Sequence, residues 1–196
     1  MRGAPVVTVE LLLDEATERA VRAEWQALAA AGLSSLAAHT APSNRPHVTL
    51  LVRPELGPFA VTERAAFPVV LGAPLLFGSG DRRVLARSVL PSRELLELHA
   101  AVHAAAGPGA PRVGSGNDAP RAGSGGDAPR AGSGGDAPHT APGEWMPHVT
   151  LARRLKVADL ERALPLLGGE LHGRALSLRR WDAASATVTD LGGFSD

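Results

Sequence analysis

The chain has 196 residues with 20 basic and 20 acidic side chains, so its formal net charge is zero. This length suits one domain or two tightly packed lobes, and the charge balance supplies no long-range field that would attract nucleic acid. Cysteine is absent, which excludes disulfides, thiolate nucleophiles and thiolate metal sites. The Val6–Leu13 run is too short to span a membrane and is interrupted by Glu10. We therefore expect a cytoplasmic protein with no membrane contact.

The first quarter of the chain predicts a strand, a helix and a second strand. Val6–Leu13 is apolar and β-branched at its start, as is typical of a strand. Asp14 follows in the N-cap position of a helix that is expected to end near Gly32. The proline-bearing loop His39–Pro46 leads into the second strand, which ends before Pro54.

The remaining segments mix short strands with helices. Thr62–Ala66 predicts a short helical turn, Ser92 caps a helix from Arg93 to about Ala106, and a helix over Val157–Leu167 is interrupted by Pro165. The predicted strands are Phe67–Leu71, Leu75–Phe77, Arg83–Leu90, Glu170–Trp181 and Ala184–Leu191, with Gly78–Asp81 as a hairpin-like turn. This arrangement favours an α+β fold over a regular βαβ alternation.

One segment, Ala110–Pro138, repeats every nine residues, as in Ala-Pro-Arg-Ala-Gly-Ser-Gly-Gly-Asp. Calcium-binding β-roll repeats share this period, but they need a large apolar residue in each turn, and here that residue is missing and a proline interrupts every unit. We interpret residues 107–143, approximately, as a disordered insert within a single domain that spans residues 1–196.

The pentapeptide Pro-His-Val-Thr-Leu occurs twice, at Pro46–Leu50 and at Pro147–Leu151. Alternate side chains of a strand share a face, so each histidine lies beside the threonine two residues later. Two such strands placed side by side would bring together two imidazoles and two hydroxyls. One imidazole can remove a proton while the other donates one, and the hydroxyls can hydrogen-bond phosphate oxygens.

The paired His-x-Thr motifs resemble the 2H phosphoesterase superfamily, specifically the bacterial 2′-5′ RNA ligase or RNA 2′,3′-cyclic phosphodiesterase branch. The run from Met146 to Arg153, Met-Pro-His-Val-Thr-Leu-Ala-Arg, is especially similar to that branch. The resemblance implies a bilobal fold in which two pseudo-symmetric lobes of antiparallel strands, with flanking helices, surround a central cleft. It also implies hydrolysis of an RNA terminal 2′,3′-cyclic phosphate to a 2′-phosphate without metal or cofactor, and in some members 2′-5′ ligation.

By this resemblance His148 is the general base (proton acceptor), His47 is the general acid (proton donor), and Thr49 and Thr150 hold phosphate oxygens. The symmetry of the two motifs does not by itself distinguish acid from base. The expected partner is RNA with a 2′,3′-cyclic phosphate end, and the expected oligomeric state is a monomer. Two alternatives stay open: a phosphodiesterase acting on small cyclic nucleotides, and a non-catalytic binder of phosphorylated RNA ends.

Three arginines and one tryptophan are candidate substrate contacts. Strict alternation places Arg53 and Arg154 on the face of the histidines, whereas the family pattern highlights Arg153, which a bulge would reconcile. Aromatic residues are few and tyrosine is absent, so base-stacking surfaces are scarce. Trp145, three residues before His148, is the best candidate for stacking a base.

Other residues are given structural interpretations. His99 and His103 are four residues apart on the predicted helix, but no third metal ligand is evident, so we expect surface histidines. Trp25 and Trp181 lie in helix and strand patterns and are expected in the core. The remaining histidines show no partner in the sequence: His39, His139 and His172.

Overall fold

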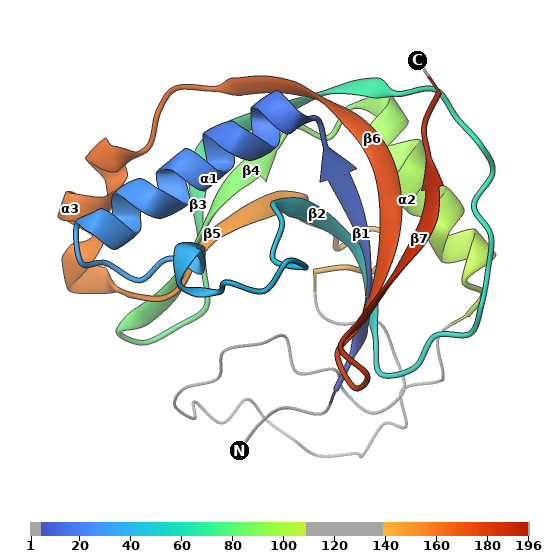
Figure 1. Cartoon of the computed structure of the whole chain (residues 1–196), viewed down its shortest axis with the longest axis horizontal. Helices are drawn as coiled ribbons and strands as arrows, with labels where there is room; N and C mark the ends of the chain where they lie inside the picture. Colours follow the sequence, from blue (N-terminus) through green and yellow to red (C-terminus); the bar gives the residue numbers. More distant parts are fainter. Residues whose placement is uncertain (1–4, 109–138, 196) are drawn as a thin grey trace.

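The computed structural model describes residues 5–108 and 139–195, which form one seven-stranded antiparallel sheet with helices packed against it (Figure 1). The nonapeptide repeat lies outside the described residues. The predicted α+β class is confirmed. The strands are β1 (Val7–Leu13), β2 (His47–Arg53), β3 (Phe67–Phe77), β4 (Arg82–Val89), β5 (His148–Lys156), β6 (Leu171–Asp182) and β7 (Thr187–Gly193). The helices are α1 (Glu15–Ala30), α2 (Arg93–Ala105) and α3 (Leu160–Ala163), with 3-10 turns at Leu36–Ala38, Val157–Asp159 and Leu164–Leu166.

Both long helices begin at the caps that the sequence predicts. The Asp14 carboxylate accepts a hydrogen bond from the Thr17 backbone N–H at 2.9 Å, and the Ser92 hydroxyl accepts one from Leu95 N–H at 3.2 Å. These bonds satisfy N–H groups that have no partner within the first helical turn. The capping residues therefore fix where each helix departs from the preceding strand.

The order of the strands across the sheet shows the internal symmetry of the fold. The order is β2-β1-β6-β3-β4-β5, so β2-β1-β6 on one side mirrors β5-β4-β3 on the other. Each half of the chain supplies a strand, a helix and a second strand, and its third strand then crosses into the other lobe. The crossing strands β3 and β6 pair at the centre, and β7 extends the sheet beside β6. The predicted pair of pseudo-symmetric lobes is confirmed.

The two lobes are joined by exchanged helices as well as by exchanged strands. Strands β2 and β5, at opposite ends of the strand order, come into contact with each other, and Figure 1 shows them next to one another in the middle of the molecule. Helix α1 belongs to the first half of the chain but packs on β6 and β5, whereas α2 from the second half packs on β2. Each motif strand is therefore supported by a helix from the other half.

Three local predictions were wrong. The segment Thr62–Ala66 is not helical but extended, because Ala65 pairs with Ser195 near the C-terminus. The two predicted strands around Gly72 form one strand, β3, whose pairing with β4 shifts register between Leu71 and Pro74. The predicted helix after β5 is divided into short α and 3-10 turns.

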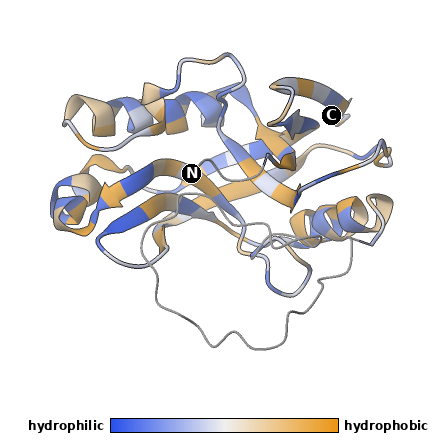
Figure 2. Cartoon of the chain, turned by 90° about the horizontal axis from the view of Figure 1, so that it is seen from below, coloured by the Kyte–Doolittle hydropathy of each residue, from blue (hydrophilic) through white to orange (hydrophobic). Residues whose placement is uncertain are grey.

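The core lies between the sheet and the helices and consists mainly of leucine and valine from every layer. The helices have mixed hydropathy in Figure 2, as expected for elements with one buried face. A charged pair crosses this core: Arg87 of β4 is 1% exposed and bonds through its Nε to Glu24 of α1 at 2.8 Å. Its guanidinium also donates to the carbonyls of Gly72 and Gly168 at 3.0 and 2.8 Å. Every nitrogen of the guanidinium is thus hydrogen-bonded, as a buried arginine requires.

Candidate active site

The two repeated motifs open the two end strands of the sheet. His47 is the first residue of β2 and His148 the first residue of β5. Both rings are partly accessible, and the two sites are close enough for the charge of His47 to affect the pKa of His148. The structure therefore brings together the four motif residues that the sequence predicts, with Thr49 and Thr150 following on the same faces of their strands.

Both imidazoles are oriented by the same backbone contact. His47 Nδ1 lies 2.7 Å from the carbonyl oxygen of Arg45, and His148 Nδ1 lies 2.7 Å from that of Met146. In each case a proline separates the two residues, and proline restricts both its own φ and the conformation of the residue before it. Because a carbonyl can only accept, Nδ1 carries the proton and donates. The Nε2 atom of each neutral ring is then left with the lone pair, as proton transfer requires.

Each motif strand bulges at the last residue of the repeated pentapeptide. Adjacent residues Val9 and Glu10 of β1 pair with Leu51 and Thr49, so Leu50 is an extra residue in β2. In the other lobe Leu85 and Ala86 of β4 pair with Ala152 and Thr150, so Leu151 is extra in β5. The repeated sequence thus produces a repeated β-bulge, and each bulge reverses the alternation of side chains that follow it.

The bulges correct the arginine prediction that rested on strict alternation. Arg53 is 5% exposed and donates to the Ala106 carbonyl at the end of α2 at 3.1 Å, away from the histidine face. In β5 the register instead places Arg153 on the face of His148 and Thr150, and Arg153 is exposed. Arg154 follows at a second irregularity with a left-handed backbone, φ 62°. Of the three candidate arginines, Arg153 is the one that the register places on the face of its motif histidine.

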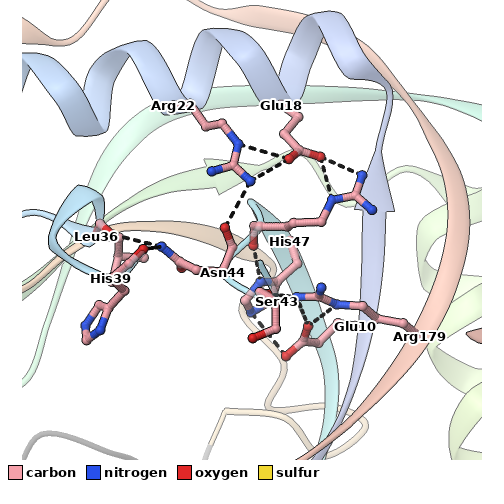
Figure 3. A network of polar contacts seen from close by, with 10 residues as sticks. Glu10, Glu18, Arg22, Leu36, His39, Ser43, Asn44, His47 and Arg179 are labelled. Carbon is pink, nitrogen blue, oxygen red and sulfur yellow. Dashed lines mark hydrogen bonds and ion pairs between the residues drawn. The ribbon is translucent and has the colours of Figure 1, made fainter. Parts of the chain in front are cut away.

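The surroundings of the first histidine contain a carboxylate that the sequence did not assign to the site. Glu10 of β1 is 4% exposed, lies opposite Thr49, and places Oε1 3.5 Å from His47 Nε2. Its other oxygen accepts a hydrogen bond from Arg179 at 2.7 Å (Figure 3). Glu10 Oε1 also accepts a hydrogen bond from the Thr8 hydroxyl at 2.8 Å. Burial opposes ionisation, but His47, Arg179 and these hydrogen bonds lower the pKa of Glu10. A negative charge therefore lies beside the first histidine.

A second carboxylate, Glu18, acts on the same histidine indirectly, through Arg45. Glu18 of α1 accepts hydrogen bonds from Arg45 at 2.6 and 2.9 Å and from Arg22 at 2.8 and 3.0 Å (Figure 3). Partial burial acts to raise the pKa of Glu18, but these two arginines outweigh it and hold that pKa below its usual value. Since the carbonyl of Arg45 also accepts from His47 Nδ1, this network fixes the ring from both sides.

The second histidine packs against an aromatic ring. The ring of Phe77, at the end of β3, lies 4.6 Å from the ring of His148, at 42°. Ala86 occupies the position opposite Thr150 that corresponds to Glu10 opposite Thr49. Burial lowers the pKa of His148, and the nearby charge of His47 lowers it further, against the contrary effect of the Met146 carbonyl. The two histidines share a backbone geometry but differ in charge environment.

The prediction of surface histidines on α2 was wrong. His99 and His103 are 4% and 9% exposed. His103 Nε2 lies 3.2 Å from the Leu50 carbonyl at the first bulge, and His99 stacks on Trp145 with ring centroids 4.0 Å apart. The helical spacing was correct, but sequence could not show that α2 turns these rings towards the first motif.

Trp145 is therefore partly committed to internal contacts. One face of its ring is covered by His99, and its indole N–H donates to the Thr49 carbonyl at 3.0 Å. Only its other face is left for the predicted stacking with a base.

The end of the predicted insert is also ordered here: residues 139–143 form turns, and Thr140 is buried, with its carbonyl 2.9 Å from His99 Nε2. The core prediction was right for Trp25, which is 2% exposed, but not for Trp181, which is only half-buried and lies outside the core.

Two features concern metals and membranes. Over residues 5–108 and 139–195 there is no group of three or more histidine, aspartate or glutamate side chains placed to hold a metal ion. In the same part of the chain, no helix is both long enough and apolar enough to cross a membrane.

Paired His-x-Thr motifs on the end strands of a pseudo-symmetric sheet define the class of two-histidine (2H) phosphoesterases. A family model described as the 2′-5′ RNA ligase superfamily matches residues 59–192. This match spans more than half of the chain, and the chain belongs to that superfamily. The matched range includes His148 but not His47, whose place in the site is given by the symmetry of the sheet.

Curated proteins and solved structures give two further results. No curated protein matched the chain in a sequence comparison. Among solved structures the chain is similar to "Crystal structure of E.coli LigT complexed with NADP+", with 12% identity, full coverage of both chains and a TM-score of 0.48. Family membership supports a 2H phosphoesterase-type function for the chain, and RNA or nucleotides are the substrates on which the family acts.

Proposed function

We propose that the protein hydrolyses 2′,3′-cyclic phosphates at RNA ends to 2′-phosphates. The carrying observation is the unequal charge around two otherwise equivalent histidines. Glu10 lies 3.5 Å from His47 Nε2, so a carboxylate stands beside the ring that we assign as the acid. Burial and an apolar neighbour favour the neutral form of His148, whose pKa is lowered. An acid and a base are what in-line opening of a cyclic phosphate needs.

In this proposal His148 Nε2 removes a proton from water, and the water oxygen forms a bond to phosphorus. The bond from phosphorus to the 3′-oxygen breaks, and His47 Nε2–H delivers its proton to that oxygen, which leaves a 2′-phosphate. The hydroxyls of Thr49 and Thr150 donate to the two nonbridging oxygens, and Arg153 adds a positive charge. In 2′-5′ ligation an RNA 5′-hydroxyl would replace the water.

A second candidate, hydrolysis of small cyclic nucleotides, is favoured by a specific observation. Two of the arginines around the first motif are already paired, Arg45 with Glu18 at 2.6 Å and Arg179 with Glu10 at 2.7 Å. Together with a net charge of zero, this leaves limited positive charge for a long phosphate backbone, which dominates RNA affinity. The chemistry would be the same, and only the size of the substrate would differ.

The test compares an RNA ending in 2′,3′-cyclic phosphate with free nucleoside 2′,3′-cyclic phosphates, in the presence of EDTA. The expected product is a 2′-phosphate, with no turnover by His47→Ala or His148→Ala and normal turnover by the exposed-histidine control His172→Ala. A 3′-phosphate product would reverse the assigned bond cleavage. Activity that survives in either alanine variant would refute the two-histidine mechanism. Turnover of the mononucleotide alone supports the second candidate, and tight binding without turnover supports a non-catalytic binder.

A further inference from the structure

Two tryptophans make matching contacts with the backbone of the two motifs. The indole N–H of Trp25, on α1, donates to the Thr150 carbonyl of β5 at 3.1 Å. The indole N–H of Trp145 donates to the Thr49 carbonyl of β2 at 3.0 Å. The partners are 125 and 96 residues apart in sequence. Each threonine is thus held by a tryptophan from the other half of the chain.

The two carbonyls stand where the sheet itself offers no donor. Strands β2 and β5 are the two ends of the strand order among the described residues, so their outer edges are not satisfied by another strand. Each threonine also immediately precedes the bulged leucine, Leu50 or Leu151, where regular pairing is interrupted. A side-chain donor at this carbonyl therefore fixes the backbone at the point where the strand would otherwise be least constrained.

Both indoles are held rigidly. Trp25 is 2% exposed, and the guanidinium of Arg22 lies 5.5 Å from the centroid of its ring. Trp145 stacks on His99 with an interplanar angle of 6°, and His99 Nε2 is in turn 2.9 Å from the Thr140 carbonyl. A donor whose own position is fixed can determine where its acceptor lies.

We propose that Trp25 and Trp145 are positioning residues for the phosphate-binding threonines, each supplied by one half of the chain to the motif of the other half. This rests on the proposed function, because it assigns the threonine hydroxyls to phosphate oxygens. The hydroxyl and the carbonyl of a threonine belong to one residue, so displacement of the carbonyl at the bulge also redirects the hydroxyl. Contacts to the nonbridging oxygens strengthen as charge develops in the transition state, so their misplacement lowers kcat more than it raises KM.

The ordinary alternative is that each tryptophan is a packing residue whose N–H donates to the nearest acceptor, as buried tryptophans usually do. The two interpretations predict different outcomes when the N–H is removed but the aromatic ring is kept. A packing residue replaced by phenylalanine changes the stability of the fold. A positioning residue also changes turnover in a fold that is still intact.

The experiment compares Trp25→Phe and Trp145→Phe with the control Trp181→Phe, using a nucleoside 2′,3′-cyclic phosphate. We expect kcat to fall about tenfold in each of the first two variants, the effect of one lost hydrogen bond at a partly buried carbonyl. KM should stay within about twofold, and the pH limbs of the rate profile should not move, because neither indole contacts a histidine of the motifs. Values of kcat equal to that of the control, or losses confined to KM, would overturn the proposal.

A second measurement does not depend on activity. In the wild-type protein the indole N–H signals of Trp25 and Trp145 should exchange with deuterium at least tenfold more slowly than that of Trp181, and should shift on addition of a nucleoside 2′-phosphate. Fast exchange of either signal, or no shift of either, would overturn the positioning role even if turnover were normal. The wild-type protein could instead show slow exchange and a ligand-induced shift but hydrolyse no cyclic phosphate. That result would refute the proposed function, and the two tryptophans would then position the threonines of a binding site.

Discussion

The carboxylate beside His47 provides a sharp test of the acid and base assignment. Glu10→Gln removes the negative charge but keeps the length of the side chain and an oxygen that can still accept from Arg179. Any effect on catalysis then reports the charge and not the packing. If His47 is the acid, its protonated form should lose a stabilising partner, and activity should become more sensitive to alkaline pH.

The size of the effect is set by the 3.5 Å between Glu10 Oε1 and His47 Nε2. Coulomb's law gives about 1.2 kcal/mol in bulk water and about 4.7 kcal/mol at an effective dielectric constant of 20. The His47 side chain is 26% exposed, and Arg179 offsets part of the charge of Glu10 from 2.7 Å. Both features favour the lower limit, so an interaction of roughly 1.4 kcal/mol is expected, which corresponds to a tenfold change in the rate at the alkaline end.

The assay is kcat/KM for a nucleoside 2′,3′-cyclic phosphate between pH 5 and 9. The Glu10→Gln variant should approach the wild-type rate at the acid end and fall about tenfold below it at the alkaline end. The control is Glu15→Gln, the same change at an exposed carboxylate of α1, which should follow the wild-type profile. Thermal melts establish that both variants are folded. A uniform loss at every pH, or a loss at the acid end only, would refute the assignment of His47 as the acid.

Three other predictions concern buried or crowded groups. Because burial lowers the pKa of His148, its base function should persist below pH 6.5, and a half-maximal point of the acid limb at or above 6.5 would contradict the assignment. Gly173→Ala should destabilise the fold by about 1–3 kcal/mol in urea titrations, since the added Cβ would overlap Thr17 Oγ1 at the start of α1. Glu24→Gln should cost about 3–5 kcal/mol of unfolding free energy, because Arg87 would keep its buried charge without a counter-ion.

Matched control variants separate the expected losses of stability from losses that any substitution of the same type would cause. Gly169→Ala places a Cβ in open space, so it should leave the urea midpoint close to that of the wild type. If it destabilised the fold as much as Gly173→Ala, steric overlap would not be the cause. Glu15→Gln again serves as the exposed counterpart of Glu24→Gln, and equal costs for the two would show that the buried pair contributes no more than a surface pair.

Local features of the fold could be predicted because they depend on neighbouring residues. The caps Asp14 and Ser92, the strand character of Val7–Leu13 and the strands that carry both motifs are all determined by periodicity and side-chain chemistry within a few residues. The predictions failed where distant pairing decides the structure. Thr62–Ala66 is extended because Ala65 meets Ser195, and neither residue carries a signal of the other.

The site shows the same limit. Alternation is counted along one strand, whereas a bulge arises from the pairing of two strands. The sheet face on which Arg53 and Arg153 lie was therefore decided by the pairing of β2 with β1 and of β5 with β4. The burial of His99 and His103 could not be predicted from the helix alone, because their acceptors lie on β2 and on the turn before β5. Glu10 did leave a trace in the sequence, since it is the one charged residue inside the apolar run Val6–Leu13.

The repeat of Pro-His-Val-Thr-Leu explains why the site is symmetric, but acid–base chemistry requires two unlike histidines. The repeated residues fix what the halves share: a proline-directed carbonyl on Nδ1, a hydroxyl on the same face and a bulge after it. The difference comes from the neighbouring strands, where Glu10 faces Thr49 and Ala86 faces Thr150 at corresponding positions. One carboxylate against one methyl group gives the two histidines different charge environments. The motif strands β2 and β5 therefore determine the geometry that the two histidines share, and the neighbouring strands β1 and β4 determine the charge difference between them.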